Sequence, residues 1–340
     1  MASLLSVENL QVQFQTKKGI NTAVDGVSFS VEKGRILGIV GESGCGKSVT
    51  SMSILQLLGS NARISGGSIK LDGKELIGLP EKEMCRIRGN DIAMIFQDPM
   101  TALNPTLTIG TQLMEPIMLH QNCGKKEAWT RAVDVLKRVG IAAPEKRMKE
   151  YPHQLSGGMR QRVMIAMAVS CEPRLLIADE PTTALDVTIQ AQILQLLRQM
   201  RAKYHLTIVL ITHDLGVVAN LADRVAVMYA GDIVEIGTAD EIYYDPRHPY
   251  TWALLSSMPQ MGVKGEDLFS IPGTPPNLFA EIRGDAFAPR NPQALKIDFV
   301  KRPPYFAVSP THKARTWLLD PRAPHIEPPA AVKKLQKEGL

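Results

Sequence analysis

The sequence has few cysteines and no long hydrophobic run. Four of its 340 residues are cysteine, none in a Cys-x-x-Cys pair: Cys45, Cys85, Cys123 and Cys171. This spacing indicates neither a disulfide framework nor a zinc site, and it is typical of a reducing, cytoplasmic compartment. No apolar stretch approaches the roughly 18 residues of a membrane-spanning helix, and residues 1–10 lack a signal-peptide pattern. We therefore expect a chain that is neither secreted nor membrane-spanning.

The sequence also lacks runs of like charge. Lys and Arg number 39 against 34 Asp and Glu, a net charge of +5, and no five like charges are consecutive. A polybasic arm for nucleic acid is therefore not expected, so nucleic acid is not a predicted partner. Apolar residues at 44% and charged residues at 21% exclude a disordered, collagen-like or coiled-coil chain. The length, about twice a typical ~150-residue domain, predicts either two domains or one large domain with an appendage.

Strand and helix patterns alternate along much of the chain. Short apolar runs rich in β-branched residues predict strands buried on both faces. These runs are residues 35–40, 92–96, 175–178, 207–212 and 224–229. Helical patterns cover residues 48–58, 126–139, 160–169 and 187–204. Strands alternating with helices predict an α/β fold with a parallel sheet.

Two regions differ from this alternation. Residues 4–14, 27–31 and 68–71 are short polar-alternating runs separated by Gly and Asp, which predicts a small antiparallel sheet. Twelve of the 23 prolines fall within residues 261–340, so this tail is predicted to contain turns and short strands rather than long helices. We predict a boundary near residue 255, with domains 1–255 and 256–340.

Residues 41–48, Gly-Glu-Ser-Gly-Cys-Gly-Lys-Ser, match the phosphate-binding loop pattern between a predicted strand and a predicted helix. The glycines let successive backbone N–H groups face a phosphate, Lys47 adds positive charge, and Ser48 offers a hydroxyl to Mg²⁺. A simple Gly-rich turn is the alternative, which the strand–loop–helix context disfavours. The predicted nucleotide-binding residues are Gly41, Ser43, Gly44, Cys45, Gly46, Lys47 and Ser48.

A second motif, residues 174–181, is an apolar run ending in Asp179 and Glu180. It predicts a carboxylate at the C-terminal edge of a buried strand, where ligands bind in open α/β sheets. Asp179 suits a magnesium shell, and Glu180 is placed to hydrogen-bond an attacking water. Taken alone, Asp-Glu after an apolar run is more often a solvated strand end. Its pairing with the phosphate-binding loop favours the functional interpretation.

Residues 155–161, Leu-Ser-Gly-Gly-Met-Arg-Gln, precede another helical pattern. Ser156 is a predicted N-cap, and Gly157 and Gly158 permit a phosphate to approach the backbone closely. A flexible helix start is the simpler alternative. We favour the functional interpretation because of the order of the motifs along the chain. The phosphate-binding loop comes first, then Leu-Ser-Gly-Gly, then the apolar run with Asp-Glu, and this order is the pattern of one family.

By these motifs, residues 4–255 resemble the ATP-binding subunits of ABC transporters. The resemblance implies a P-loop NTPase core with a parallel sheet, a small antiparallel β subdomain, an α-helical subdomain and a Pro-rich C-terminal extension. Gln97 resembles the family's Gln loop, Asp186 its D-loop and His213 its switch histidine. Phe14 resembles the aromatic that stacks on adenine, with core or edge packing as the alternative.

In this family two ATP-binding subunits close head to tail, so each ATP lies between the phosphate-binding loop of one and the signature of the other. The resemblance therefore implies that the partner's ATP is contacted by Ser156, Gly157, Gly158 and Met159. It also implies ATP and Mg²⁺ as cofactors, with the metal held by Ser48, Gln97 and Asp179. The implied catalytic residues are Glu180, His213 and Gln97.

Three further segments are similar to the oligopeptide, dipeptide and nickel importer subfamily: residues 96–105, 248–255 and 271–276. Many members carry Gly-Cys-x-Phe-x-x-Arg-Cys in the extension, part of a four-cysteine iron–sulfur site. Here residues 284–291 read Gly-Asp-Ala-Phe-Ala-Pro-Arg-Asn, with Asp285 and Asn291 at the cysteine places. Since no cysteine follows Cys171, we expect no iron–sulfur cluster.

The resemblance implies an ATPase subunit of an oligopeptide importer at the cytoplasmic face of the membrane. Its implied partners are a second ATP-binding subunit, two membrane permeases and an external peptide-binding protein. Import of dipeptides, nickel or another small solute is the alternative within the class. A soluble ABC ATPase acting on ribosomes or nucleic acid is disfavoured by the single cassette, and a non-hydrolysing subunit by the presence of Gln97, Glu180 and His213.

Overall fold

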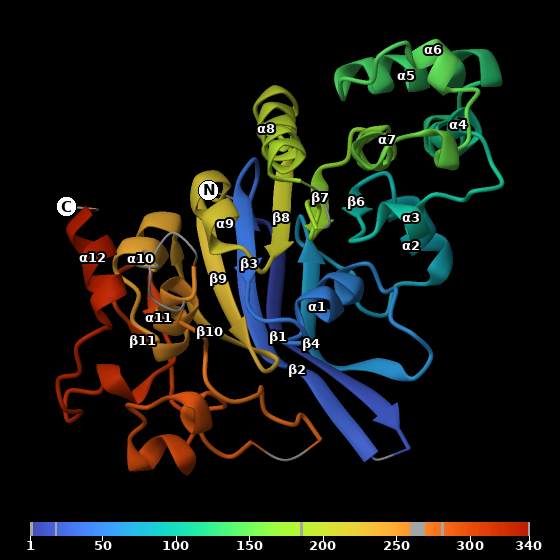
Figure 1. The fold of residues 1–340 in the computed structure, drawn as a ribbon. Helices are drawn as coiled ribbons and strands as arrows, with labels where there is room; N and C mark the ends of the chain where they lie inside the picture. Colours follow the sequence, from blue (N-terminus) through green and yellow to red (C-terminus); the bar gives the residue numbers. More distant parts are fainter. Residues whose placement is uncertain (1–2, 18, 184–185, 259–268, 280–281, 339–340) are drawn as a thin grey trace. The chain divides into compact units, whose positions relative to one another are not determined.

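The computed structural model describes residues 3–17, 19–183, 186–258, 269–279 and 282–338 (Figure 1). The chain divides into two compact units, each built from several stretches of sequence. Unit 1 contains Met1–Leu4, Val31–Arg35 and Leu76–Ile211. Unit 2 contains Leu5–Ser30, Ile36–Glu75 and Thr212–Leu340.

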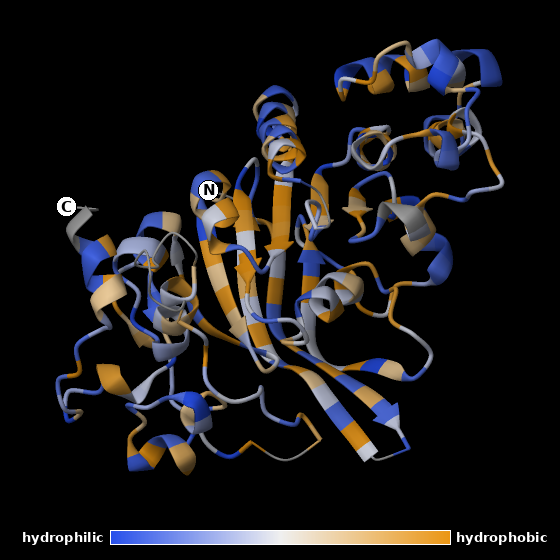
Figure 2. Ribbon diagram, viewed as in Figure 1, coloured by the Kyte–Doolittle hydropathy of each residue, from blue (hydrophilic) through white to orange (hydrophobic). Residues whose placement is uncertain are grey.

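Unit 1 contains three parallel strands in the order β6 (Ile92–Ile95), β7 (Leu175–Asp179) and β8 (Thr207–Thr212). Every residue of β7 and β8 is buried, and Figure 2 shows the apolar character of both strands. The predicted strands buried on both faces are therefore present in parallel register, with Ala178 opposite Leu210. The register continues to Asp179, which places its carboxylate at the carboxyl end of β7.

The helices of unit 1 form the predicted α-helical region. In α5 the buried residues Ala128, Ala132 and Leu136 recur every four positions, so one stripe of the helix packs against its neighbours. Helix α4 packs against α5 and α7, and α7 also packs against β6 (Figure 1). The bounds are α2 (Glu81–Ile87), α3 (Pro99–Ala102), α4 (Ile109–Gln121), α5 (Lys125–Arg138), α6 (Pro144–Arg147), η1 (Pro152–Gln154), α7 (Gly157–Val169) and α8 (Val187–Tyr204).

Unit 2 contains the predicted antiparallel sheet, in the order β2 (Gly19–Glu32), β1 (Ser3–Thr16), β4 (Ala62–Leu71) and β5 (Lys74–Glu75). Both β1 and β2 have 14 residues, so β2 is much longer than the predicted strand at 27–31. Gly26, which directly precedes the predicted strand, lies within β2 at φ 78°. Glycine tolerates this left-handed conformation without ending the strand.

Unit 2 also contains β3 (Ile36–Val40), which pairs in parallel with β9 (Arg224–Tyr229). Antiparallel neighbours follow in the order β10 (Asp232–Thr238), β12 (Lys313–Ala314) and β11 (Phe306–Ala307). Strand β10 was not among the predicted strands. Helix α9 packs on β3, where a side chain at Gly38 would meet Val218 at 2.4 Å. The helices are α1 (Lys47–Ile54), α9 (Leu215–Leu221), α10 (Ala239–Tyr244), α11 (Pro249–Ser256) and α12 (Ala330–Glu338).

The described part of the Pro-rich tail contains the predicted turns and short strands. Besides β11 and β12 it has three 3₁₀ helices, η3 (Ala288–Arg290), η4 (Lys296–Phe299) and η5 (Trp317–Leu319). Only α12 departs from the predicted pattern, with nine residues. Residues on both sides of position 255 belong to unit 2, and the division into 1–255 and 256–340 stays a prediction.

Candidate functional site

The predicted phosphate-binding loop connects β3 to α1 in unit 2. At two of its positions only glycine fits, because the backbone of another segment lies too close for a side chain. A Cβ at Gly41 would lie 2.1 Å from the Met228 carbonyl oxygen, and one at Gly46 would lie 2.7 Å from that of Ala23. Gly46 is the N-cap of α1 at φ 106°, so the loop ends at a helix N-terminus whose amide groups attract anions.

Lys47, the first residue of α1, is folded back across the loop. Its Nζ atom donates to the carbonyl oxygens of Gly41 at 2.8 Å and Glu42 at 2.9 Å. The residue is 5% exposed. The ammonium group therefore lies inside the turn formed by residues 41–46, where a bound phosphate would compete for its N–H groups.

Cys45 completes the turn. Its amide donates to the Glu42 carbonyl oxygen at 3.4 Å, and its own carbonyl oxygen accepts from the Gly231 amide at 2.9 Å. Burial raises the pKa of the Cys45 thiol, against the opposing effect of Lys47. The thiol is thus protonated at neutral pH and serves as a small packing group.

Phe14 lies near the end of β1, opposite Ala62 of β4, and is half-buried. Ser48 is exposed in the first turn of α1, next to the buried Lys47. His213 is exposed at the N-terminal side of α9, whose N-cap Asp214 accepts from the amides of Gly216 and Val217. These three residues belong to unit 2, together with the loop. Their predicted roles at a nucleotide stay predictions.

The acidic motif and Gln97 come together in unit 1. Asp179 is 5% exposed at the end of β7. The Glu180 Oε2 atom accepts from Gln97 Nε2 at 2.9 Å and from the Thr183 hydroxyl at 2.8 Å. Glu180 has a φ of 47°, a strained value for this residue, and its amide donates to the Ile211 carbonyl oxygen at 2.8 Å. The turn after β7 therefore holds the Glu180 carboxylate in a defined position.

The signature segment also has the local structure that its sequence predicts. Ser156 is the N-cap of α7, and its hydroxyl accepts from the Met159 amide at 3.4 Å. Gly157 and Gly158 are the first two residues of the helix. A side chain at Gly158 would lie 3.2 Å from Ile189, whereas one at Gly157 would meet no atom within 4 Å. The open space at Gly157 leaves the helix N-terminus accessible to a ligand.

The D-loop is described in part. Ala184 and Leu185 lie outside the described residues. Asp186 is the N-cap of α8 and accepts from the Ile189 amide at 2.9 Å. Its predicted D-loop role stays a prediction.

Two residues from outside the motif, Tyr250 and Arg290, contact the predicted phosphate-binding loop. The Tyr250 hydroxyl accepts from the Glu42 amide at 2.8 Å. Arg290 of the tail donates from Nη1 and Nη2 to the two carboxylate oxygens of Glu42, at 2.6 and 3.0 Å. The sequence signal for Arg290 was its place in the segment 284–291, where the subfamily pattern also has arginine.

Asp285 and Asn291, which stand at the cysteine places of the subfamily pattern, both make local hydrogen bonds. Asp285 Oδ1 accepts from the Phe287 amide at 2.9 Å, and Asn291 Oδ1 accepts from the Gln293 amide at 3.0 Å. Both side chains therefore stabilise turns. Within the described ranges of the chain, no group of three or more His, Cys, Asp or Glu side chains could hold a metal ion.

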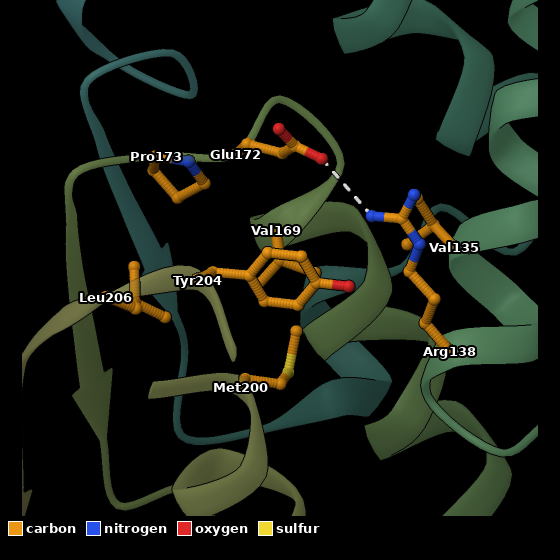
Figure 3. Close-up of a pocket in the computed structure, with 8 residues that line it drawn as sticks. All are labelled: Val135, Arg138, Val169, Glu172, Pro173, Met200, Tyr204 and Leu206. Carbon is orange, nitrogen blue, oxygen red and sulfur yellow. Dashed lines mark hydrogen bonds and ion pairs between the residues drawn. The ribbon is translucent and has the colours of Figure 1, made fainter. Parts of the chain in front are cut away.

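A cavity of about 170 Å³ lies elsewhere in unit 1 (Figure 3). Its wall is mainly apolar, and an ion pair between Arg138 and Glu172 at 3.2 Å crosses its rim. None of its lining residues is a predicted site residue; they are Val135, Arg138, Val169, Glu172, Pro173, Met200, Tyr204 and Leu206.

Comparison with known proteins adds a relationship over nearly the whole chain. Residues 24–183 match the family described as ABC transporter, and residues 234–297 match "Oligopeptide/dipeptide transporter, C-terminal region". The chain is 57% identical to the oligopeptide transport ATP-binding protein OppD of Bacillus subtilis over 98% of this chain and 94% of that one. It is 55% identical to the dipeptide transport ATP-binding protein DppD of Lactococcus lactis, over 96% and 93%.

Solved structures agree with this relationship. A dimeric ATP-binding cassette in a post-hydrolysis state, bound to ADP and Pi, is 28% identical with a TM-score of 0.63. The match covers 69% of this chain and 98% of that one. The extra length of this chain is consistent with a C-terminal region beyond the cassette.

Proposed function

Because the chain belongs to the ABC transporter family, in its oligopeptide and dipeptide branch, we propose that it hydrolyses ATP to power oligopeptide import. The observation that carries the ATPase activity is the loop 41–48, with Lys47 folded inside it at the N-terminus of α1. The 57% identity with an oligopeptide transport ATP-binding protein supports the substrate class. A second candidate, dipeptide import, rests on the 55% identity with a dipeptide transport protein.

The proposed chemistry is an in-line attack of water on the γ-phosphoryl group. Lys47 would exchange its contacts with Gly41 and Glu42 for phosphate oxygens. Glu180 would orient the water, because Gln97 and Thr183 hold its carboxylate in place. His213 would hydrogen-bond the γ-phosphate region, and Phe14 would stack on the adenine ring.

The proposed metal is Mg²⁺, held by Ser48, Gln97 and Asp179. These residues provide hydroxyl, amide and carboxylate oxygens, the hard donors that Mg²⁺ prefers. When bound, the ion would neutralise charge on the phosphate oxygens. The protein's own contribution is the buried carboxylate of Asp179 at the end of β7.

As a component of an ABC transporter, the chain works with membrane permease subunits. We propose two such subunits, a second ATP-binding subunit that closes head to tail with this chain, and an external peptide-binding protein. In that dimer Ser156, Gly157, Gly158 and Met159 would contact the partner's ATP, with Asp186 at the interface. No helix in the described ranges is long and apolar enough to cross a membrane. We propose that the chain binds peripherally at the cytoplasmic face.

The test measures ATP binding to the full chain and peptide uptake by the reconstituted transporter. Lys47→Ala should lower ATP affinity strongly, because it removes the ammonium group from the loop. Uptake should require ATP and should favour peptides longer than two residues. ATP-dependent uptake of dipeptides alone would support the second candidate. No ATP binding by the parental chain would contradict both.

A further inference from the structure

We propose that Arg290, in the C-terminal extension, is a positioning residue for the phosphate-binding loop: it neutralises and holds Glu42, so that the loop accepts an anionic nucleotide. This inference rests on the proposed binding of ATP by residues 41–48. It gives the extension a role in the affinity of the site for ATP. The contacts that carry it all lie within unit 2.

The contact between Arg290 and Glu42 is bidentate and partly shielded from solvent. The two guanidinium nitrogens lie 2.6 and 3.0 Å from the two carboxylate oxygens. The Arg290 side chain is 4% exposed and that of Glu42 is 26% exposed. A bidentate hydrogen bond of this kind fixes the orientation of the carboxylate and also neutralises its charge.

The guanidinium group is itself fixed by the tail and by β9. Nε donates to the Pro272 carbonyl oxygen at 2.8 Å, and Nη1 also donates to the Tyr229 hydroxyl at 3.2 Å. The rings of Tyr229 and Phe287 lie 5.8 and 5.9 Å from the guanidinium carbon. Arg290 therefore reaches Glu42 from a preorganised position and loses little rotamer freedom in the contact.

Tyr250 of α11 holds the backbone of the same residue. Its hydroxyl accepts from the Glu42 amide at 2.8 Å, and its ring is fully buried. Tyr250 packs on Tyr229 at 4.5 Å and on Phe287 at 5.2 Å, measured between ring centroids. Burial raises the pKa of Tyr250 well above its usual range, so the hydroxyl stays neutral. Side chain and backbone of Glu42 are thus both fixed by residues more than 200 positions away.

Electrostatics makes this contact relevant to nucleotide binding. A carboxylate in an anion-binding loop repels phosphate, and the repulsion is larger in a partly buried site than in water. Arg290 and Lys47 together provide two positive charges against the one negative charge of Glu42. Without Arg290, the net charge of Lys47 and Glu42 would be zero, and the Glu42 carboxylate would have no positive partner. The guanidinium therefore protects the anion affinity of the loop.

The test is a double-mutant cycle on the full chain, read as the equilibrium dissociation constant for ATP. Arg290→Met should raise the constant about tenfold or more, because a charged hydrogen-bonded pair is lost and Glu42 is left unpaired. Glu42→Gln should not weaken ATP binding. Glu42→Gln with Arg290→Met should return the constant to within about threefold of the parental value, since the unpaired charge is removed. Arg290→Lys, which keeps the charge, should fall between the parental chain and Arg290→Met.

Arg302→Met is the matched control. Arg302 also joins the extension to the rest of unit 2, through Asp25 at 2.7 Å and Asp232 at 2.8 Å, and it does not contact the phosphate-binding loop in the described structure. Its removal should leave the ATP dissociation constant unchanged. Circular dichroism and thermal unfolding of each variant would verify that it is folded.

Several results would overturn the inference. One is that Arg290→Met binds ATP with the same dissociation constant as the parental chain. Another is that the double variant binds ATP no more tightly than Arg290→Met. The third is that Glu42→Gln alone lowers the affinity for ATP tenfold. The last measurement is informative even if Arg290→Met fails to fold. A parental chain that binds no ATP would instead refute the proposed function, so the two failures are distinguishable.

Discussion

At the scale of single residues, Asp285 is a buried carboxylate next to a buried histidine. The side chain is buried, and burial raises its pKa to about 6. Its Oδ2 atom lies 3.8 Å from Nε2 of His248, a fully buried ring whose pKa is lowered to about 4 by burial. At neutral pH the carboxylate is therefore charged beside a neutral imidazole, which is unfavourable for stability.

We expect Asp285→Asn to stabilise the chain at pH 8. The folded-state pKa of Asp285 exceeds its unfolded value of 3.8, so the folded state binds the proton more tightly. This contribution to stability is complete below about pH 4 and is lost as the pH rises through about 6. The variant should exceed the parental chain by roughly 2–3 kcal/mol at pH 8 and by little at pH 4. Denaturant unfolding of both proteins at pH 4 and pH 8 measures the difference in the free energy of unfolding. The same difference at both pH values would contradict the raised pKa of Asp285.

A second residue-scale prediction concerns Glu180. Glu180→Gln removes the carboxylate that orients water but keeps an oxygen that accepts from Gln97 and Thr183. ATP binding should be retained, turnover should fall by about 10³-fold or more, and the closed dimer should accumulate. Single-turnover hydrolysis in the assembled transporter measures this. Hydrolysis at the parental rate would refute the role of Glu180.

At the scale of elements, several predicted site residues lie at the ends of helices or strands, where polar backbone groups are unsatisfied. Helix α1 begins inside the predicted phosphate-binding loop, α7 begins at the predicted signature, and α8 is capped by Asp186, the predicted D-loop residue. The side chains of Ser156 and Asp186 cap their own helices. Capping thus explains why Ser and Asp suit these positions, because it stabilises the N-termini of α7 and α8. Their contact with a nucleotide is a separate prediction.

Ser156→Arg should leave ATP binding by this chain unchanged and should impair turnover of the complex, because the signature is proposed to contact the partner's ATP. Arginine also removes the N-cap, so Ser156→Asp is the companion variant. Aspartate retains the cap and suits the helix dipole, yet its charge repels phosphate. Both variants should lose turnover. Loss of ATP binding in the isolated chain would contradict the head-to-tail assignment.

At the scale of the whole molecule, parts of the C-terminal extension pack against the rest of unit 2. Arg302 and Arg315 both pair with Asp232 at 2.8 Å, and the Arg315 amide donates to the Val234 carbonyl oxygen at 2.7 Å. Deeper in the fold, His312 Nε2 lies 2.8 Å from Oε1 of the fully buried Glu235. Ion pairs, strand pairing and aromatic packing thus hold the Pro-rich segment in place.

We predict that the extension resists limited proteolysis in the assembled complex. Its backbone is paired with β10 through β12, so a protease would have to open that pairing first. Mass spectrometry of the digest should show no early product ending near residue 255. Rapid trimming to that point would contradict the packing of the tail.

The extension is also predicted to be free of an iron–sulfur cluster. No cysteine follows Cys171, and Asp285 and Asn291 offer hard oxygen donors rather than thiolates. Iron and acid-labile sulfide analysis of anaerobically purified protein should give no stoichiometric iron. Stoichiometric iron would refute the prediction.

Contiguous motifs were sufficient to predict the strand–loop–helix structure around residues 41–48, the strand that ends at Asp179 and the helix capped by Ser156. Each depends on residues close together in sequence, where glycine conformations, caps and strand patterns act locally. Strand β10 and the full length of β2 were missed because pairing with neighbouring strands, rather than local pattern, defines their extent. The contacts of Arg290 and Tyr250 with Glu42 were decided by the tertiary structure alone. They join residues more than 200 positions apart, and a single sequence carries no periodicity or spacing that specifies such a pair.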